Sequence, residues 1–350
     1  MIYGDYQPRG IVKQTTPLLR WNVRSNDGQQ IGSVELSING KKVKAEYNSE
    51  KEAVEYRPNE GLDAGLYKVV CRATIPGQVT ARQDWTFEVN PAGEDAPIAS
   101  ALALDEINLV RKELGLPSFR SDQRANDAAM AHSRYMSQHG VCGHVESADK
   151  PGFTGVQPWD RLQAFGYQGT CYEDSCIGEG DPRAAVRLLF DAPYHRIAFL
   201  QPGSSDIGVG MIGGALTTDF IVSDQSGVST SPSDGQNDIP LSWDGNESPS
   251  PLRIHGVSGE VGYPIVFGYF SPNLESIRIS SFEVKNERGD VVPGMLNTPA
   301  NDPELRFAAV FLPSATLAPS AKYRVFVKAK TRSGKSIDRA WTFTTRATGP

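Results

Sequence analysis

Two stretches of this 350-residue chain repeat one design. The stretch "YKVVCRATIPGQVTARQDWTFEV" begins at Tyr67 and "YRVFVKAKTRSGKSIDRAWTFTT" begins at Tyr323. In each stretch the tyrosine stands 18 residues before a tryptophan, which is Trp85 in the first and Trp341 in the second. Apolar and polar residues alternate in both, which is the period of a strand with one buried face. The repeat therefore predicts the same all-β fold near both ends of the chain.

The inward-facing positions of the two copies also correspond. They are Tyr67, Val69, Cys71 and Ala73 in the first copy and Tyr323, Val325, Val327 and Ala329 in the second. Because Cys71 takes the place of Val327, we interpret it as a small buried hydrophobic residue. Short alternating strands and turn residues predict a β-sandwich for each segment. Both segments resemble bacterial immunoglobulin-like domains that end in a "WTFTT"-type strand, a resemblance that concerns fold and not activity.

Two polar stretches divide the chain into thirds. Residues 91–100, "PAGEDAPIAS", and 226–240, "SGVSTSPSDGQNDIP", are rich in Pro, Gly, Ser and Asp and have no apolar period. Such composition is typical of linkers or exposed loops. We therefore predict three separately folded domains, at residues 1–91, 97–225 and 236–347.

The middle third has a helical pattern. The stretches at 103–115, 121–140 and 181–193 show helical spacing, capping residues, or a terminal glycine or proline. The strand-like stretches "IGVGMIG" and "DFIVS" follow them. Helices that precede strands predict an α+β domain, or a three-layer α-β-α sandwich, between the two all-β segments.

Composition excludes several classes of function. The net charge is −6 and no cluster of Lys and Arg stands out, which argues against nucleic acid as a partner. No run approaches 18 apolar residues, so we predict no transmembrane segment. The start, "MIYGDYQPRG", lacks the pattern of a signal peptide. No CxxC pair occurs, which disfavours a cysteine-rich zinc site.

Three ionisable residues of the middle third lie in predicted loops. His144 stands in "GVCGHVES", Glu173 in "CYEDSC", and His195 in "DAPYHRIAFLQPG", just after the third predicted helix. His132 and His139 are seven residues apart on one predicted helix, and we interpret both as packed or solvated helix-face residues. Loop-borne ionisable groups in one domain indicate a candidate site.

The order of motifs from about residue 100 to 224 resembles the CAP superfamily, also called the SCP or cysteine-rich secretory protein domain, in its bacterial extracellular branch. The matching stretches are "INLVR", "GHV", "WDRLQAFGY", "YED", "APYHR" and "IGVG". The resemblance implies that His144 and His195 are the two site histidines, that Glu173 is the site glutamate, and that all three face one cleft. We expect Arg111 and Arg161 to be structural partners of acids on neighbouring elements.

The chain also departs from the family pattern. Ala192, preceded by Asp191, lies nearest to the position where many members carry a second glutamate. Asp174 and Ser175 replace the Asn and Ile of the Glu-Asn-Ile motif, and Leu189 replaces a tryptophan. A four-residue metal or acid–base site is therefore not expected. The location of His195 after a helix C-terminus would also suit a cation.

Two histidines and one carboxylate in a cleft could act in three ways. They could hold a divalent ion such as zinc, with His144, Glu173 and His195 as at most three ligands of a weak site. They could be catalytic groups of a general acid–base pair in hydrolysis. They could also bind a small molecule, a lipid, a peptide or a wall polymer. No Ser or Cys stands in the context of a nucleophile, so we make no prediction about whether the protein is an enzyme.

The leading hypothesis is a secreted or surface-displayed bacterial protein whose CAP domain recognises a ligand, with the sandwiches as spacers or adhesive modules. The alternative is a metal-dependent hydrolase that acts on peptide or cell-wall material. A third hypothesis is that the sandwiches bind the partner and the CAP cleft is vestigial. In an oxidising extracellular setting we expect a disulfide between Cys171 and Cys176, with Cys142 as the rival partner.

Overall fold

The computed structural model describes residues 2–8, 10–12, 14–25, 29–76, 80–89, 96–178 and 180–347. The chain divides into two compact units. The first comprises Met1–Ala99 with Gly178–Pro182 and Ile212–Gly214, and the second comprises Ser100–Ile177, Arg183–Met211 and Ala215–Pro350. Each unit is described in turn below.

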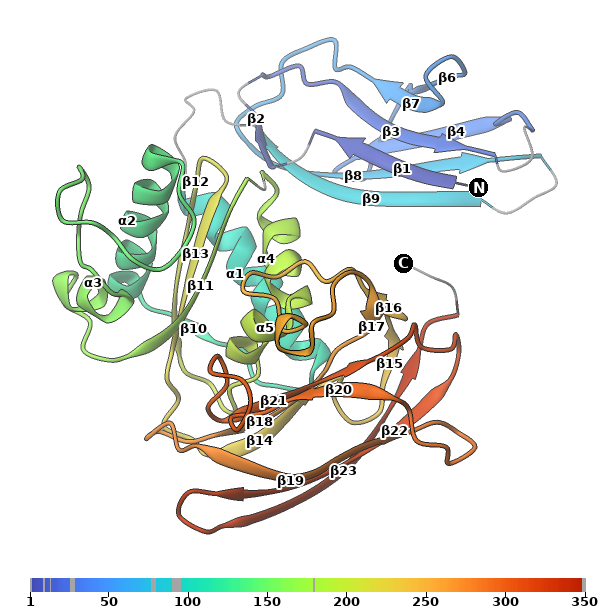
Figure 1. Cartoon of the computed structure of the whole chain (residues 1–350). Coiled ribbons are helices and arrows are strands. Elements are labelled where there is room, and N and C mark those ends of the chain that lie inside the picture. Colours follow the sequence, from blue (N-terminus) through green and yellow to red (C-terminus); the bar gives the residue numbers. More distant parts are fainter. Residues whose placement is uncertain are drawn as a thin grey trace. The chain divides into compact units, whose positions relative to one another are not determined.

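The first unit is built on a β-sandwich (Figure 1). One sheet has the strand order β1-β3-β7-β6 and the other has the order β2-β9-β8-β4-β5. The strands are β1 (Ile2–Gln7), β2 (Gly10–Val12), β3 (Leu19–Arg24), β4 (Ser33–Ile38), β5 (Lys41–Val43), β6 (Glu46–Asn48), β7 (Ala53–Tyr56), β8 (Gly65–Thr74) and β9 (Thr80–Val89).

The C-terminal part of the chain, in the second unit, is also a β-sandwich (Figure 1). Its sheets have the orders β14-β18-β21-β20 and β15-β23-β22-β19, and β16 pairs with β17. The elements are β14 (Gly227–Ser231), β15 (Gln236–Ile239), β16 (Ser242–Trp243), the 3₁₀ helix η1 (Arg253–His255), β17 (Val261–Gly262), β18 (Ile265–Phe270), β19 (Ile277–Lys285), β20 (Gly294–Asn297), β21 (Ala308–Pro313), β22 (Lys322–Thr331) and β23 (Ser336–Thr345).

The repeated sequence forms the same antiparallel hairpin in both sandwiches. In β8 and β9, Val69 pairs with Trp85, and in β22 and β23, Val325 pairs with Trp341. In each hairpin the tyrosine ring stacks on a phenylalanine of the partner strand, at 5.5 Å in the first sandwich and 5.3 Å in the second. Cys71 is fully buried in the core, as expected of a small hydrophobic residue. The immunoglobulin-like assignment stays a prediction.

The segment 226–240 is not a linker, contrary to our expectation. Residues within it form β14 and β15, which belong to the two sheets of the C-terminal sandwich. Ser229, Thr230 and Ser231 are buried although they are polar. The apolar alternation by which strands were recognised is therefore absent from this segment. Within the other predicted linker, residues 91–95 lie outside the described part of the chain, and a helix begins at Ala96.

The middle part of the chain is an α+β domain in three layers. Its four-stranded sheet has the order β10-β12-β13-β11, with α2 and α3 on one face and α1, α4 and α5 on the other (Figure 1). The elements are α1 (Ala96–Glu113), β10 (Arg120–Ser121), α2 (Gln123–His139), α3 (Pro158–Ala164), β11 (Cys171–Ile177), α4 (Pro182–Asp191), α5 (Pro193–Phe199), β12 (Asp206–Ile212) and β13 (Ala215–Ile221).

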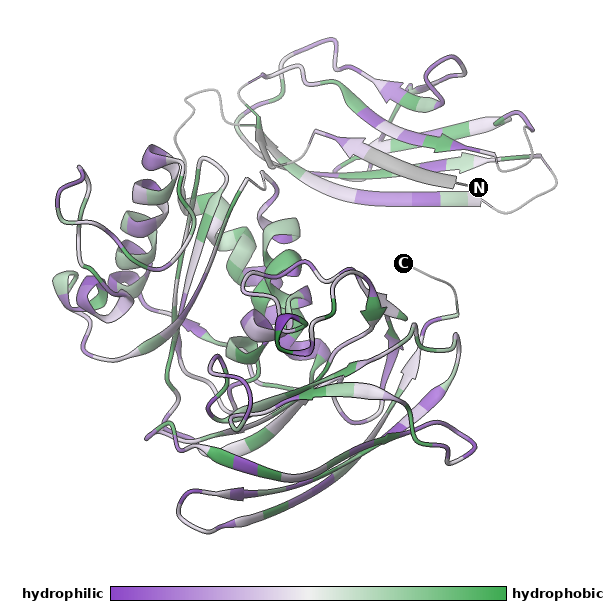
Figure 2. Ribbon diagram, in the orientation of Figure 1, coloured by the Kyte–Doolittle hydropathy of each residue, from purple (hydrophilic) through white to green (hydrophobic). Residues whose placement is uncertain are grey.

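Hydrophobic residues face the interior of this domain. Helix α1, which carries buried residues such as Ile107 and Val110, is largely hydrophobic, whereas α2 bears hydrophilic residues on its outer side (Figure 2). Every residue of the inner strand β13 is buried. Three of them, Thr217, Thr218 and Asp219, are polar. Buried polar side chains require hydrogen-bond partners, and one of the three, Asp219, lies opposite Glu173 of β11 at the candidate site.

Helix α2 begins and ends where local chemistry predicts. The Asp122 carboxylate accepts hydrogen bonds from the backbone N–H groups of Arg124 and Ala125, which satisfies two groups at the helix start. At the other end Gly140 has φ 61°, the left-handed conformation that glycine adopts without strain. The chain then leaves the helix as the loop that carries His144.

Candidate functional site

The loop between α2 and α3, residues 141–157, is held to the domain by hydrogen bonds. The Glu146 N–H donates to the Val156 carbonyl at 3.2 Å, so the two sides of the loop lie next to each other. The Ser147 N–H donates to the Tyr135 hydroxyl at 2.9 Å, which ties the loop to α2. The guanidinium of Arg161, on α3, donates to the His144 carbonyl at 3.0 Å. His144 is therefore presented by a well-anchored loop.

A buried cluster of charges lies beneath this loop. Arg161 forms an ion pair with Glu173 on β11 and lies 3.9 Å from Glu146. His132, on α2, contacts Glu146 at 2.9 Å through Nδ1 and the Gly143 carbonyl at 2.8 Å through Nε2. The side chains of His132, Glu146, Arg161 and Glu173 are all at most 1% exposed. This cluster confirms the expected structural role of Arg161 and shows that His132 is a packed residue.

Asp219 adds a further buried acid to the cluster. It lies opposite Glu173 in the antiparallel pairing of β11 with β13. Burial raises the pKa of Asp219 well above its usual value, and the charge of Glu173 raises it further. Burial would also raise the pKa of Glu173, but the hydrogen bond to His144 and the charge of Arg161 hold it below its usual value. Glu173 is therefore ionised at neutral pH, whereas Asp219 holds its proton to a higher pH than an ordinary aspartate does.

His144 is the solvent-exposed end of this network. Its side chain is 47% exposed, and its Nδ1 lies 3.0 Å from Oε1 of the buried Glu173. An ionised Glu173 can accept a hydrogen bond from Nδ1–H, which fixes the ring orientation. Among the described residues Nε2 of His144 has no hydrogen-bond partner, so it can donate to a ligand or accept from one. The structure thus brings together two of the three predicted site residues.

His195 follows helix α4 (Pro182–Asp191), as expected, but it also lies in a second helix that the sequence did not predict. Helix α5 begins at Pro193, so His195 lies in the first turn of a helix. A helix start disfavours a cation there, because the dipole is positive at that end. The carboxylate of Glu247 offsets this effect, since its Oε1 lies 2.9 Å from Nδ1 of His195. Burial would lower the pKa of His195, but Glu247 and Asp174 outweigh burial and raise it to about 9.

Asp174 interacts electrostatically with both His195 and His144. Successive side chains of a strand point to opposite faces, so Glu173 and Asp174 lie on opposite sides of β11. Burial raises the pKa of Asp174 to about 7, while the charges of His195 and His144 act in the opposite direction. Among the described residues no hydrogen bond or ion pair joins His195 to His144 or Glu173. The predicted cluster therefore consists of two pairs, His144 with Glu173 and His195 with Glu247.

The first of the three possible roles, a zinc site, is not supported by the described residues. In the described part of the chain no group of three His, Cys, Asp or Glu side chains is arranged to hold a metal ion. Glu173 already pairs with the cation Arg161, which would repel a second cation, and His195 contacts Glu247. His144, Glu173 and His195 do not fit a zinc ion, and we derive no chemistry through one.

The predicted disulfide between Cys171 and Cys176 is also wrong. All four cysteines carry free thiols, and Cys71, Cys171 and Cys176 are buried. Cys171 and Cys176 are the first and sixth residues of the extended strand β11, not a closed loop. Five steps along a strand separate Cα atoms by about 16 Å, whereas a disulfide needs less than about 7 Å. The rival partner Cys142 instead donates to the Ser175 carbonyl at 3.7 Å.

Arg111 is buried, but its partners are not acids. Its guanidinium donates to the carbonyls of Pro117, Phe199, Gln201 and Gly203 at 2.7–2.8 Å. Burial lowers its pKa to about 9. Arg111 thus holds the segment that contains Pro117 against the segment between α5 and β12. Its role is structural, as we expected, but its partners are backbone carbonyls and not acids.

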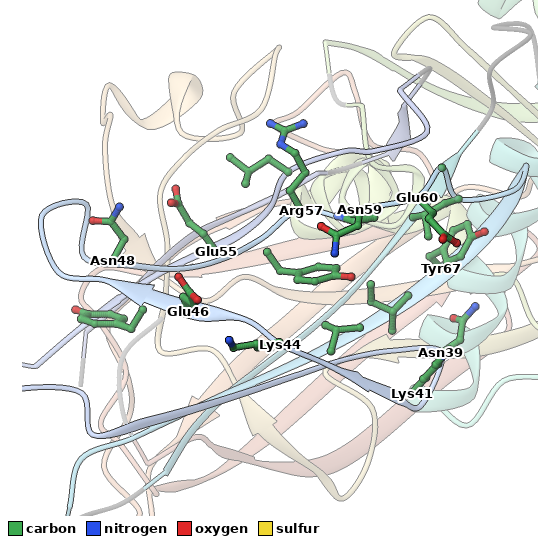
Figure 3. A pocket seen from close by; sticks show the side chains of 18 of the residues that line it. Asn39, Lys41, Lys44, Glu46, Asn48, Glu55, Arg57, Asn59, Glu60 and Tyr67 are labelled. Carbon is green, nitrogen blue, oxygen red and sulfur yellow. The ribbon is translucent and has the colours of Figure 1, made fainter.

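A concave region lies on the N-terminal sandwich. This groove of about 1410 Å³ is lined by aromatic, amide and charged side chains, among them Glu55, Arg57, Asn59 and Tyr67 (Figure 3). Several of these groups already have partners within the sandwich. Glu55 pairs with Arg20 at 3.2 Å, and Arg57 donates to the Thr16 carbonyl at 2.7 Å. We therefore place the candidate site at His144, where a half-exposed ring covers a buried ionic cluster.

The fold and the site together define a class of protein domain. It has three layers of helices and sheet, and an exposed histidine contacts a buried cluster of acidic and basic side chains. Residues 104–224 match the model of the CAP family, described as the cysteine-rich secretory protein family. This part of the chain is a CAP domain.

Solved structures show partial similarity. An extracellular protein containing an SCP domain from Bacillus anthracis strain Ames is 18% identical, with a TM-score of 0.32, over 62% of this chain and 66% of that chain. CopC from Methylosinus trichosporium OB3b is 13% identical, with a TM-score of 0.23, over 35% of this chain and 94% of that chain. PcoC, a copper resistance protein from Escherichia coli, is 20% identical, with a TM-score of 0.19, over 24% of this chain and 92% of that chain. No curated protein matches the chain.

Proposed function

We propose that the CAP domain of this protein binds an extracellular ligand that has an apolar body and a hydrogen-bonding head group. The observation that carries the proposal is the half-exposed His144 ring above the buried Glu173 carboxylate. Buried charges are expensive to desolvate, so a buried ionic cluster that ends in an exposed ionisable group is a candidate functional site. The head group of the ligand would bind to Nε2 of His144.

The apolar part of the ligand has a matching surface. We define the apolar rim as Val145, Phe153, Val156 and Trp159, whose side chains are 60%, 37%, 42% and 49% exposed. The Glu146–Val156 hydrogen bond and the contacts of Arg161 with the carbonyls of His144 and Gly155 support their proximity. Neighbouring exposed apolar side chains on a folded domain favour a binding surface.

The extracellular location is supported by the family, which is described as secretory. No helix in the described part of the chain is long and apolar enough to cross a membrane. Recognition is better supported than metal-dependent hydrolysis, because the described residues form no metal-ligand group. A His144–Glu173 pair could still serve as a general base, but no Ser, Thr or Cys of the described chain hydrogen-bonds to the free Nε2 of His144.

Trp159 provides a direct test, because it is exposed while Trp21, Trp85, Trp243 and Trp341 are buried. We expect sodium dodecanoate to shift the Trp159 emission to shorter wavelength and to protect it from acrylamide quenching. His144→Ala should weaken dodecanoate binding about 10-fold, the effect of losing one hydrogen bond to a charged group. Val257→Ala, which removes an exposed apolar side chain elsewhere, is the matched control.

Two results would contradict the proposal. One is an absence of protection of Trp159 by dodecanoate, and the other is equal binding by wild type and His144→Ala. Muramyl dipeptide is titrated in parallel as a wall fragment. If muramyl dipeptide protects Trp159 and dodecanoate does not, the ligand of the domain is a wall fragment and not an amphipathic molecule.

A further inference from the structure

We propose that Glu247 is a positioning residue of the CAP-domain site, so that the chain of the C-terminal sandwich completes a site that the CAP domain does not complete alone. This inference rests on the proposed function and extends it to a residue outside the CAP match, which ends at residue 224. Glu247 lies in the loop between β16 and β17, and its side chain is fully buried.

One oxygen of Glu247 holds the start of helix α5. Its Oε1 accepts hydrogen bonds from the backbone N–H of Tyr194 at 2.8 Å and of His195 at 3.1 Å, and lies 2.9 Å from Nδ1 of His195. The residue before the helix, Ala192, has no side chain that can cap it. Glu247 therefore caps α5 from 52 residues away and fixes both the backbone and the ring of His195.

The position of Glu247 is set by contacts of the C-terminal sandwich with the same helix. The Tyr194 hydroxyl donates to Asp302, and the Asn297 amide donates to Asp302 at 2.6 Å and to the Pro251 carbonyl at 2.9 Å. Asn297 thus links the Glu247 loop to the partner of Tyr194. These buried contacts leave the loop little freedom to move away from α5.

Arg196 forms a further link between α5 and the C-terminal sandwich. Its guanidinium donates to the Pro264 carbonyl at 2.9 Å and lies 4.4 Å from the centre of the Tyr263 ring. Tyr194, His195 and Arg196 are consecutive, and each contacts the C-terminal part of the chain. Helix α5 is therefore held from both sides, by the CAP domain and by the sandwich.

Two acids face His195 from different elements. Glu247 approaches from the β16–β17 loop, and Asp174 interacts with His195 from β11. Asp174 also interacts with His144 and Glu173. Helix α5, which carries His195, packs against β11, the strand that carries both Glu173 and Asp174. The His195–Glu247 pair and the His144–Glu173 pair are therefore connected through this strand. Loss of Glu247 would free the His195 ring and change the field at His144.

The test uses the full chain with Glu247→Ala and Glu247→Gln. The glutamine can keep the accepting oxygen and lose the charge, whereas the alanine loses both. Glu304→Gln is the matched control, since Glu304 is exposed and pairs with Arg253 on the same part of the chain. The first readout is the Nδ1–H signal of His195 in NMR spectra at one pH, assigned with His195→Gln. The second readout is the affinity for dodecanoate.

We expect Glu247→Ala to lose the His195 Nδ1–H signal and to weaken dodecanoate binding about 5-fold or more, the usual size of coupling between sites. Glu247→Gln should retain the signal and most of the affinity. If Glu247→Ala does not fold, Glu247→Asp is tested in its place. This change shortens the side chain by one methylene group. If Glu247→Ala keeps the His195 signal, or loses it with unchanged affinity, the inference is overturned. Failure of wild type to bind dodecanoate would instead contradict the proposed function, because the His195 signal needs no ligand.

Discussion

At the scale of single residues, Arg161 is the cation that makes the buried site stable. It neutralises Glu173 and lies near Glu146, and none of the three side chains is more than 1% exposed. Removing one partner of a buried ion pair leaves an uncompensated charge in a medium of low dielectric. Arg161 was expected to be structural, but Glu146, which stands two residues after His144 in "GHVES", was not predicted as its partner.

We expect Arg161→Met to lower the free energy of unfolding by about 3–5 kcal/mol at pH 7, measured by urea denaturation. The pKa values of Glu146 and Glu173 are held below their usual range, so their contribution is present at neutral pH and lost as pH falls through their folded pKa values. The difference between wild type and variant should therefore shrink at low pH. Arg120→Met, at an exposed ion pair with Asp206, should change stability little, and an equally small change in Arg161→Met would show that the cluster is not stabilising.

At the scale of elements, two glycines let strand β12 pack directly against helix α2. A Cβ added at Gly208 would lie 2.3 Å from the Ala125 carbonyl oxygen, and one added at Gly210 would lie 2.2 Å from the Met130 backbone nitrogen. Backbone atoms cannot move aside as a flexible side chain can. The "IGVG" stretch is therefore a packing requirement of the sheet, and this packing places α2 and its His132 above β13.

We expect Gly210→Ala to destabilise the protein by about 1–3 kcal/mol or more, because the helix and sheet must separate. The same change at Gly180, whose added Cβ would meet nothing within 4 Å, should have little effect. Urea denaturation of the two variants measures the difference. Equal stability of both variants would mean that the contact between β12 and α2 is less close than described.

At the scale of the whole molecule, most of the CAP domain belongs to the same compact unit as the C-terminal sandwich. The equivalent tryptophans of the two sandwiches, Trp85 and Trp341, allow a matched comparison, since both are buried. Truncation of a buried tryptophan to alanine removes about 3–5 kcal/mol of stability from the unit that contains it. We expect the CAP domain to lose stability when the tryptophan of the C-terminal sandwich is truncated, and not when the tryptophan of the N-terminal sandwich is truncated.

We therefore expect Trp341→Ala to increase hydrogen exchange at the amides of α2, which packs on the sheet of the CAP domain, whereas Trp85→Ala should leave them unchanged. Mass spectrometry of peptides from residues 123–139 measures both variants. An unchanged α2 in Trp341→Ala would show that the C-terminal sandwich unfolds independently of the CAP domain. That result would support our earlier expectation of three separately folding domains.

The sequence alone determined the features that depend on local pattern. The period of two and the tyrosine-to-tryptophan spacing predicted the two hairpins, because strand period and turn chemistry act over a few residues. The caps of α2 were predictable for the same reason. The order of family motifs predicted that His144 and Glu173, 29 residues apart, meet at one site.

Tertiary structure alone decided the rest. Whether "CYEDSC" is a loop or a strand depends on its pairing with β13, and this pairing both separates Cys171 from Cys176 and places Asp219 opposite Glu173. The contact of His195 with Glu247 joins residues 52 positions apart, and nothing in either stretch of sequence indicates it. Such contacts form only when distant elements pack, because a buried charge takes whichever opposite charge or donor the fold brings within reach.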